Sequence, residues 1–300
     1  MPYLRRMDAA RTYANHGALA TEFEDRLAAQ IGAEGARFSA ASNGTIAIVG
    51  AILASAGRSR PERPLAIIPG LTFVATAIAA SQCGYEPYFV DVDADSWLLQ
   101  PEALLGSDVL SRTGVVIPVA AFGRPVAQRA WQSFSEFTRI PVVIDAAAGF
   151  EQLESAPSSF VGPLPVALSL HATKSFAIGE GGGILTTDDG LTARVRQALN
   201  FGFHGSRLSE TASVNGKLSE IHACVGLAEL DGWPQKRAAL DGVAALYRIA
   251  ARECDLNEDV IVWPAISRCY ALVRTLSAEM TEAVRVALDG DGIETRTWYG

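Results

Sequence analysis

Cysteine is scarce in this chain of 300 residues, and its few thiols do not pair in sequence. The four cysteines are scattered and form no CxxC motif: Cys83, Cys224, Cys254 and Cys269. The four histidines likewise lack the spacing of metal ligands: His16, His171, His204 and His222. These absences argue against a disulfide framework and against a metal site. We therefore expect no metal centre and a reducing, cytoplasmic environment.

Positive charge and long apolar runs are in short supply as well. The chain carries 25 lysines and arginines against 33 aspartates and glutamates, which gives a net charge of −8, and it has no basic run. Such a composition does not favour nucleic acid or an anionic membrane as a partner. The apolar stretches are too short for a transmembrane helix. The N-terminal residues, MPYLRRMDAARTY, hold no apolar core for a signal peptide.

The motifs of several enzyme classes are also missing. The chain has no GxGxxG after a predicted strand, no GxxxxGK[ST], no HExxH and no GxSxG. This argues against a dinucleotide-binding unit, a P-loop, a zinc protease and an α/β-hydrolase. What remains is an ordinary globular balance, with 49% apolar and 19% charged residues. The length suits one large domain or one and a half.

Short apolar runs alternate with helical stretches over the first two thirds of the chain. The runs are too short for helices and are apolar on both faces, which is typical of interior strands covered by helices on both sides. The alternation predicts right-handed crossovers and a mainly parallel sheet. The predicted strands are 37–41, 65–69, 87–91, 115–119, 142–145, 166–170 and 182–187, and the predicted helices between them are 22–30, 47–56, 74–83 and 126–137.

After Asp188 the alternation of predicted strands and helices ends. Helices are predicted at 190–199, 217–231 and 235–252, and a strand at 269–274 and a helix at 277–289 follow them. We place a domain boundary near residue 235. It separates a large domain, residues 1–234, from a smaller α+β domain, residues 235–300. Because no stop signal or helix cap precedes Gly300, we expect the C-terminal domain to be incomplete.

A lysine lies in the loop between two predicted strands. The stretch SLHATK ends at Lys174, and a glycine-rich turn at 179–183 leads into the next strand. The two strands are expected to be neighbours in the sheet. A lysine held in a partly desolvated pocket is a nucleophile that forms Schiff bases with carbonyl groups. By position alone, a loop lysine is more often a solvated surface residue, so this interpretation depends on the surrounding residues.

An aspartate ends one of the predicted interior strands. The run VVID places Asp145 at the carboxyl end of its strand, which is where ligands of open α/β sheets bind. A carboxylate there can pair with a protonated pyridine nitrogen and so keep the ring an effective electron sink. It can equally well cap the helix that follows.

Three further segments carry candidate binding residues. In SNGT, Gly44 and Thr45 open a helix whose free backbone N–H groups can bind phosphate, although Asn-Gly is first of all a turn signal. Phe73 follows a predicted strand and can stack on a cofactor ring, although such a residue is more often part of the core. Asn215 begins the segment NGKLSE, which opens a helix and can reach a neighbouring subunit.

In this order, the segments resemble the DegT/DnrJ/EryC1/StrS family of fold-type I aminotransferases, which use pyridoxal phosphate and act on nucleotide-linked keto sugars. The resemblance covers about residues 20–250 and rests on SNGT, GLTFVATA, FVDVDADSW, VVIDAAAGF, SLHATKSFAIGEGGGILTT and NGKLSEIHACVGLAEL. It implies a three-layer α/β/α large domain with a mainly parallel sheet, plus the smaller α+β domain. It also implies transfer of an amino group, from glutamate, to a nucleotide-linked keto-deoxy sugar.

The resemblance assigns chemical roles to three residues. Lys174 forms the Schiff base with the aldehyde of pyridoxal phosphate and later moves the proton. Asp145 pairs with the pyridine nitrogen of the cofactor, and Phe73 stacks on its ring. Lys174 is thus the catalytic residue that the resemblance implies.

The resemblance also implies how the cofactor phosphate is held. The backbone at Gly44 and Thr45 and the hydroxyl of Ser169 bind the phosphate, and these donors suit it because they are fixed in place. Asn215 reaches the phosphate of the cofactor in the other subunit. A homodimer with shared active sites follows from that role.

Departures from the family pattern leave alternatives open. Ala148 stands three residues after the aspartate, where the family commonly has a Gln or His that touches the 3-hydroxyl of the cofactor. Family members also usually run longer. A catalytically impaired or regulatory homologue is therefore one alternative. A sugar dehydratase of the same family is another, and it is disfavoured because those members have histidine where this chain has Lys174.

Overall fold

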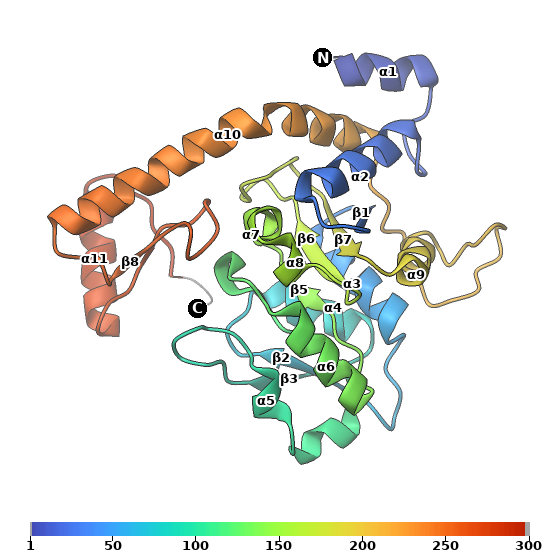
Figure 1. Cartoon of the computed structure of the whole chain (residues 1–300), viewed down its shortest axis with the longest axis horizontal. Coiled ribbons are helices and arrows are strands. Elements are labelled where there is room, and N and C mark those ends of the chain that lie inside the picture. The colour runs from blue at the N-terminus through green and yellow to red at the C-terminus, as the bar shows by residue number, and fades with distance from the viewer. Residues whose placement is uncertain (1, 298–300) are drawn as a thin grey trace.

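The computed structural model describes residues 2–297 (Figure 1). Its centre is a sheet made of two hydrogen-bonded parts, joined where Val116 pairs with Val142 and Val119 with Asp145. The strands of this sheet are β1 (Arg37–Ala41), β2 (Leu65–Pro69), β3 (Glu86–Val90), β4 (Thr113–Val116), β5 (Ile144–Asp145), β6 (Val166–Ser169) and β7 (Gly182–Thr186). Across the sheet they follow the order β3-β2-β4-β5-β6-β7-β1.

The sheet is mainly parallel, as the alternation of strands and helices predicts. Strands β3, β2, β4, β5 and β6 pair in parallel with one another, in that order. Strand β7 runs antiparallel to both β6 and β1. The β6–β7 pairing also confirms that the strands on either side of the Lys174 loop are neighbours.

Helices cover both faces of the sheet, so its strands are buried on both sides (Figure 1). Within β2, Ile67 belongs to the core on one face, whereas Ala66 and Ile68 belong to the core on the other, because successive side chains point to opposite faces. The first face packs against α2 (Ala18–Ile31), α6 (Gln128–Thr138), α7 (Phe150–Ser155), α8 (Pro157–Phe160) and the first half of α10 (Glu220–Glu253). The second packs against α3 (Gly44–Ser55), α4 (Val74–Gln82) and α9 (Asp189–Leu199). This is the predicted three-layer α/β/α arrangement.

The prediction of two helices at 217–231 and 235–252 is wrong, because α10 runs unbroken from Glu220 to Glu253 through Pro234. A proline inside a helix lacks the N–H for one backbone hydrogen bond and costs about 3 kcal/mol or more. Long-range contacts on both sides of Pro234 offset this cost.

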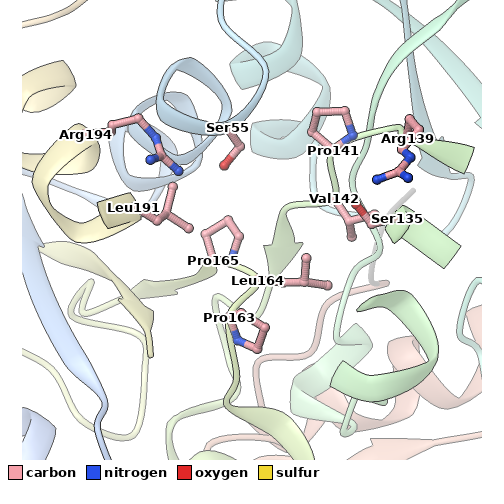
Figure 2. Close-up of a pocket in the computed structure, with 10 residues that line it drawn as sticks. All are labelled: Ser55, Ser135, Arg139, Pro141, Val142, Pro163, Leu164, Pro165, Leu191 and Arg194. Atoms are coloured by element: carbon pink, nitrogen blue, oxygen red, sulfur yellow. The ribbon is translucent and has the colours of Figure 1, made fainter. Parts of the chain in front are cut away.

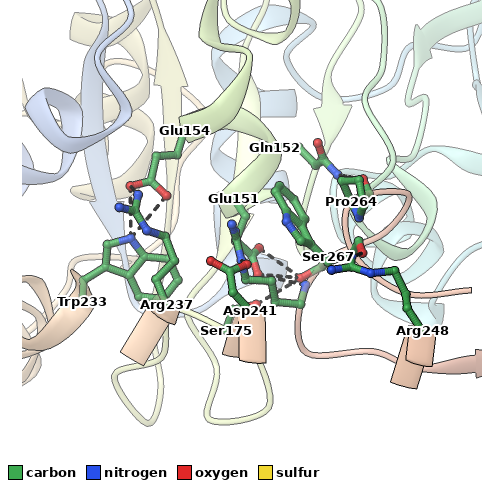
Figure 3. A network of polar contacts seen from close by, with 12 residues as sticks. Glu151, Gln152, Glu154, Ser175, Trp233, Arg237, Asp241, Arg248, Pro264 and Ser267 are labelled. Carbon is green, nitrogen blue, oxygen red and sulfur yellow. Dashed lines mark hydrogen bonds and ion pairs between the residues drawn. The ribbon is translucent and has the colours of Figure 1, made fainter. Parts of the chain in front are cut away.

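Trp233 and Arg237 supply those contacts. The indole of Trp233 is fully buried, and its Nε1 donates to Glu154 of α7 at 3.2 Å. One turn further on, Arg237 forms an ion pair with the same carboxylate, at 2.9 Å. Both interactions are drawn in Figure 3. They hold the helix against the large domain at the point where the sequence predicts a break.

The C-terminal unit is small. It contains the two-stranded sheet of β8 (Val260–Ile261) and β9 (Leu272–Val273) and the helix α11 (Ala278–Gly290). The predicted strand at 269–274 is thus only two residues long. The predicted domain boundary near 235 falls inside α10 and stays a prediction. Residues 298–300, on which the expectation of an incomplete domain partly depends, lie outside the described residues.

The remaining element boundaries lie close to the predicted ones, and α2 shows why some differ. This helix begins at Ala18, four residues before its predicted start. The carboxylate of Glu220 accepts hydrogen bonds from the backbone N–H groups of Leu19 and Ala20, both at 3.0 Å. A residue 200 positions away therefore caps the helix, which no local pattern can indicate. The short helices α1 (Pro2–Ala10), α5 (Pro101–Leu104), α7 and α8 and the strand β8 are not among the predicted elements. Over residues 2–297, none of the helices is both long and apolar enough to cross a bilayer.

Candidate active site

The carboxyl edge of the sheet gathers most of the predicted site residues. Asp145 ends β5, Ser169 ends β6, and Lys174 lies in the loop that joins β6 to β7. The start of α3, at Gly44, lies against Ser169: a Cβ atom added to Gly44 would be 2.7 Å from the Cβ of Ser169. The residues thus meet at the edge where ligands of parallel sheets bind.

Lys174 is largely buried. Its Nζ donates a hydrogen bond to the hydroxyl of Tyr270 at 3.0 Å. Burial lowers the pKa of the Lys174 amine, and electrostatic interactions with Cys269, Asp145 and Glu151 oppose that shift. An amine with a lowered pKa is more often neutral near pH 7, and the neutral form is the nucleophile.

Asp145 is a buried carboxylate with fixed hydrogen-bond donors. Its two oxygens accept from the hydroxyl of Thr76, at 2.6 Å, and from the backbone N–H of Ala147, at 3.0 Å. Burial raises the pKa of Asp145, although these two bonds and the charge of Lys174 act in the opposite direction. A cationic group that enters beside this carboxylate would stabilise its charged form.

The first turn of α3 forms a cradle for an anion. The side chain of Asn43 caps the helix by accepting from the N–H of Ile46, at 2.9 Å. The geometry of a helix start leaves the N–H groups of Gly44 and Thr45 without acceptors inside the helix. Ser169 Oγ lies beside them and accepts from the N–H of His171 at 3.3 Å, so its hydrogen can point to an anion. These donors suit a phosphate.

Phe73 and Asn215 lie at the margins of this site. Phe73 directly precedes α4, and its side chain is 56% exposed. Because Thr76, on the first turn of the same helix, bonds Asp145, the start of α4 is anchored at the site. Asn215 Oδ1 accepts from Lys217 Nζ at 2.7 Å, and the carbonyl of Gly216 accepts from the N–H of Ser42, just before α3. The predicted role of Asn215 concerns a second chain and stays a prediction.

Sequence reasoning missed four residues that touch this site: Thr76, Glu151, Ser267 and Tyr270. Thr76 had a weak signal, since it lies one turn after Phe73 in the motif GLTFVATA. The other three carry no motif. Ser267 and Tyr270 follow Lys174 by more than 90 residues, and only the path of the chain brings them back.

A shallow pocket of about 290 Å³ lies at the opposite edge of the sheet (Figure 2). Pro141 and Val142 precede β5 and Pro165 precedes β6, so these residues mark the amino ends of the strands. The lining contains none of the predicted site residues: it comprises Ser55, Ser135, Arg139, Pro141, Val142, Pro163, Leu164, Pro165, Leu191 and Arg194. We therefore place the candidate active site at the Lys174 edge. Among the described residues there is also no group of three or more His, Cys, Asp or Glu that could hold a metal ion.

The residues at the Lys174 edge fit one kind of group. An anion cradle, a buried amine and a buried carboxylate suit a molecule with a phosphate, an aldehyde and a basic ring nitrogen. A model of the DegT/DnrJ/EryC1/StrS aminotransferase family matches residues 1–300. The chain belongs to this family.

Curated and solved members of the DegT/DnrJ/EryC1/StrS family are similar over most of this chain. Protein Rv3402c of Mycobacterium tuberculosis is 33% identical over 269 residues, which are 86% of this chain and 63% of the relative. A UDP-2-acetamido-2-deoxy-3-oxo-D-glucuronate aminotransferase of Pseudomonas aeruginosa is 31% identical over 290 residues, which are 93% of this chain and 76% of the relative. The chain thus spans less than two thirds of the length of Rv3402c.

A solved structure shares the fold. The crystal structure of DesI, determined in the presence of its TDP-sugar product, has a TM-score of 0.83 and 30% identity. The match covers 98% of this chain and 74% of DesI. Together with the sheet order and the helix layers, this likeness confirms the predicted fold-type I architecture of pyridoxal-phosphate-dependent transferases.

Proposed function

We propose that this chain is a pyridoxal-phosphate-dependent aminotransferase that transfers an amino group to a nucleotide-linked keto-deoxy sugar. The observation that carries the proposal is the burial of Lys174 beside Asp145, on the loop between β6 and β7 of a DegT/DnrJ/EryC1/StrS fold. The two groups are close enough to affect each other, since the charge of Asp145 raises the pKa of Lys174 and the charge of Lys174 lowers that of Asp145. These are the two groups that such chemistry demands of the protein.

The residues of the site divide the work of holding the cofactor. Gly44, Thr45 and Ser169 would bind its phosphate, and Lys174 would bind its aldehyde carbon. Asp145 would pair with the ring nitrogen, and Thr76 keeps that carboxylate oriented. The bound cofactor supplies an electron sink next to the substrate nitrogen.

Two further residues complete the proposed cofactor site. Phe73 lies against the face of the cofactor ring. Asn215 reaches the phosphate in the active site of a second subunit, so the working form is a homodimer. The large domain, residues 1–234, carries the cofactor, and residues 235–300 belong to the small domain.

Lys174 also moves the proton in each half-reaction. With the cofactor bound, the amine of Lys174 would be the base that takes the proton from the substrate carbon and gives it up again at the other end of the 1,3-shift. The amino group comes from glutamate in the first half-reaction and goes to the keto sugar in the second. The nucleotide class is supported by relatives, since the Pseudomonas enzyme is named for a UDP-linked sugar and DesI was solved with a TDP-sugar.

The first test is the visible absorption spectrum of the purified protein with added pyridoxal phosphate. We expect a band that borohydride abolishes, with a pyridoxyl group fixed on Lys174 in the peptide map. The chain has three lysines, so Lys217 and Lys236 are internal controls for non-specific modification. A chain that takes up no cofactor, or takes it up equally on all three lysines, contradicts the proposal.

The second test identifies the sugar. UDP-linked and dTDP-linked amino sugars are each incubated with 2-oxoglutarate, and the glutamate formed is measured, which runs the reaction in reverse. We expect glutamate from one nucleotide class and none from free amino sugars. Glutamate from free sugars alone would contradict the nucleotide part of the proposal and leave the aminotransferase part standing.

A further inference from the structure

A segment of the C-terminal unit returns to the edge of the large sheet. Ile266 is fully buried against Ala121 and Phe122, and the N–H of Ser267 donates to the carbonyl of Phe122 at 2.8 Å. Nearby, the side chain of Gln152 donates to the carbonyl of Pro264 at 2.9 Å (Figure 3). The segment 264–270 therefore has fixed contacts on the large domain, although it belongs to the least buried part of the chain.

A buried carboxylate anchors this segment to the Lys174 loop. Glu151 of α7 is 1% exposed and accepts from Ser267 Oγ at 3.0 and 3.1 Å and from the N–H of Arg268 at 3.0 Å. Ser267 Oγ also lies 3.0 Å from the hydroxyl of Ser175, the residue after Lys174 (Figure 3). Because Ser267 has one hydroxyl hydrogen and gives it to the carboxylate, Ser175 must donate to Ser267. We call Glu151, Ser267 and Ser175 the serine–glutamate anchor.

The anchored segment delivers Tyr270 to Lys174. The Lys174 nitrogen lies 3.0 Å from the hydroxyl oxygen but 5.7 Å from the centre of the ring, so it meets the hydroxyl edge and not the ring face. The ring of Tyr270 packs edge-on against Phe122, and Phe122 packs in the same way against Trp97, each pair at 5.7 Å. The phenol is thus held both by its backbone and by its ring.

We propose that Tyr270 is a positioning residue for Lys174 and that the serine–glutamate anchor holds it there. The inference deepens the proposed function and rests on it, because it assigns a partner to the amine that would bind the cofactor and move the proton. An unbranched lysine side chain has many rotamers. When its nitrogen is not bound to the cofactor, only a few of these rotamers place the amine near the reacting carbon. A hydrogen bond of 3.0 Å to a fixed hydroxyl favours one of these rotamers for the free amine.

The titratable groups that act on Lys174 come from three parts of the chain. Asp145 lies at the end of β5, Glu151 on α7, and Cys269 beside Tyr270 on the returning segment. The hydroxyl of Tyr270 accepts from the amine, and an acceptor stabilises the protonated form more than the neutral one. Removing only that hydroxyl should therefore lower the pKa of Lys174 while the three neighbours stay in place.

The test is competitive amine labelling of the full cofactor-free chain at a series of pH values, read by mass spectrometry of the lysine peptides. It requires no activity and no cofactor. In Tyr270→Phe, we expect the labelling midpoint of Lys174 to fall by about half to one pH unit, which makes labelling near pH 7 about threefold to tenfold faster. Greater exposure alone would raise the rate at high pH and, because burial lowers the pKa of Lys174, would move the midpoint up and not down. An unchanged midpoint overturns the proposal.

Matched variants separate positioning from general loosening. Tyr85→Phe removes a tyrosine hydroxyl that bonds the carbonyls of Ala56 and Gly57, away from Lys174, and should leave the Lys174 midpoint unchanged. Ser267→Ala breaks the anchor and should move the midpoint in the same direction as Tyr270→Phe, but less. The double variant should move it no further than Tyr270→Phe does alone. A double variant that shows the full sum of the two shifts overturns the role of the anchor.

The two proposals fail in different ways. If the unmodified chain takes up no pyridoxal phosphate but Tyr270→Phe still moves the Lys174 midpoint, the proposed function fails and the positioning contact stands. If the chain takes up the cofactor on Lys174 and the midpoint does not move, only the positioning role fails. Glu151→Gln is the harsher variant of the anchor; where it fails to fold, Ser267→Ala carries the test alone.

Discussion

The large sheet and the C-terminal unit bury their residues to very different degrees. Every residue of β2, β6 and β7 is buried between two layers of helices. In the C-terminal unit, by contrast, α11 has no buried residue among those described, and the strands β8 and β9 are two residues long. Yet both regions meet at Lys174. The sheet supplies the groups that can do chemistry, whereas the C-terminal unit supplies a contact that orients one of them.

This difference shows that the stability of the large sheet and the position of Tyr270 at Lys174 have separate sources. Among the described residues, the two cores that hold Lys174 and Asp145 contain no buried residue beyond Trp233. Tyr270 reaches the site only because a few polar contacts tie a poorly buried segment to α7. Four experiments can break or sharpen this comparison, and they follow in order of expected effect.

The largest effect is expected from Lys174→Ala. Loss of the nitrogen that binds the cofactor and moves the proton should reduce turnover by a factor of about 10²–10⁴. The melting temperature should not fall, because the buried amine is a cost to folding in the cofactor-free chain. Lys236→Ala, which removes an ion pair with Glu229 on α10, is the control and should keep most of the activity. Turnover within tenfold of the unmodified enzyme would refute the role of Lys174.

Next come two isoleucines that are equally buried, one in each region. Ile67→Ala should lower the free energy of global unfolding by about 2–5 kcal/mol, because it leaves a cavity in the core of the sheet. Ile266→Ala should instead loosen the returning segment and leave global unfolding much less affected. Urea unfolding measures the first effect, and hydrogen exchange of peptides from 255–275 measures the second. Equal losses of global stability would show that the two regions unfold as one.

A smaller effect is expected from Thr76→Val. The variant removes a hydrogen bond to the charged form of Asp145, a bond worth about 1.5–3 kcal/mol. Hydrogen bonds to a carboxylate lower its pKa, so their loss raises the pKa of Asp145 further, and the acid limb of the activity profile should move to higher pH. Thr192→Val, at a buried threonine of α9 that bonds the carbonyl of Asp188, is the matched control. An acid limb that stays in place would separate Thr76 from the titration of Asp145.

The smallest effect concerns the pH dependence of stability in the cofactor-free chain. Because burial lowers the pKa of Lys174 from 10.5 in the native state, the unfolded chain binds more protons between the two values. Stability should therefore rise with pH towards 10.5, by at most about 1.4 kcal/mol per pH unit, and Lys174→Met should flatten the rise. Lys217, whose pKa burial also lowers, adds to the slope in every variant. Urea unfolding from pH 7.5 to 10 measures the slope of the free energy of unfolding against pH, with Lys236→Met as the control. A slope in Lys174→Met equal to that of the unmodified chain would contradict the burial of the amine.

The sequence alone predicts the sheet, and it places several candidate site residues at one edge of it, for a physical reason. Strands such as Leu65–Pro69 are buried on both faces, so they appear in the sequence as continuous apolar runs without polar residues at alternate positions. Lys174 and Asp145 each end or follow such a run, and their places at the sheet edge follow from the order of the elements. The polar ends of interior strands are therefore the part of the site that local patterns can predict.

The rest of the site depends on contacts between distant residues. Glu220 caps α2 across 200 positions, and Glu154 stabilises α10 on both sides of Pro234, where the local pattern predicts a break. Tyr270 meets Lys174 across 96 positions, in a segment with no motif. In each case one polar atom bonds a residue far away in the chain, and neither periodicity nor composition changes at either end. Such contacts cannot be predicted from local sequence.

The length of α10 has a mechanical consequence. At about 1.5 Å per residue, the 20 residues that follow Trp233, as far as Glu253, extend about 30 Å, so a tilt of about 5° about Trp233 moves the helix end by nearly 3 Å. Asp241, which forms an ion pair with Arg268 at 2.7 Å, lies only about 12 Å from Trp233. The same tilt displaces that attachment by about 1 Å. A tilt of the helix would thus displace the far end of the C-terminal unit more than the attachment at Arg268, two residues before Tyr270.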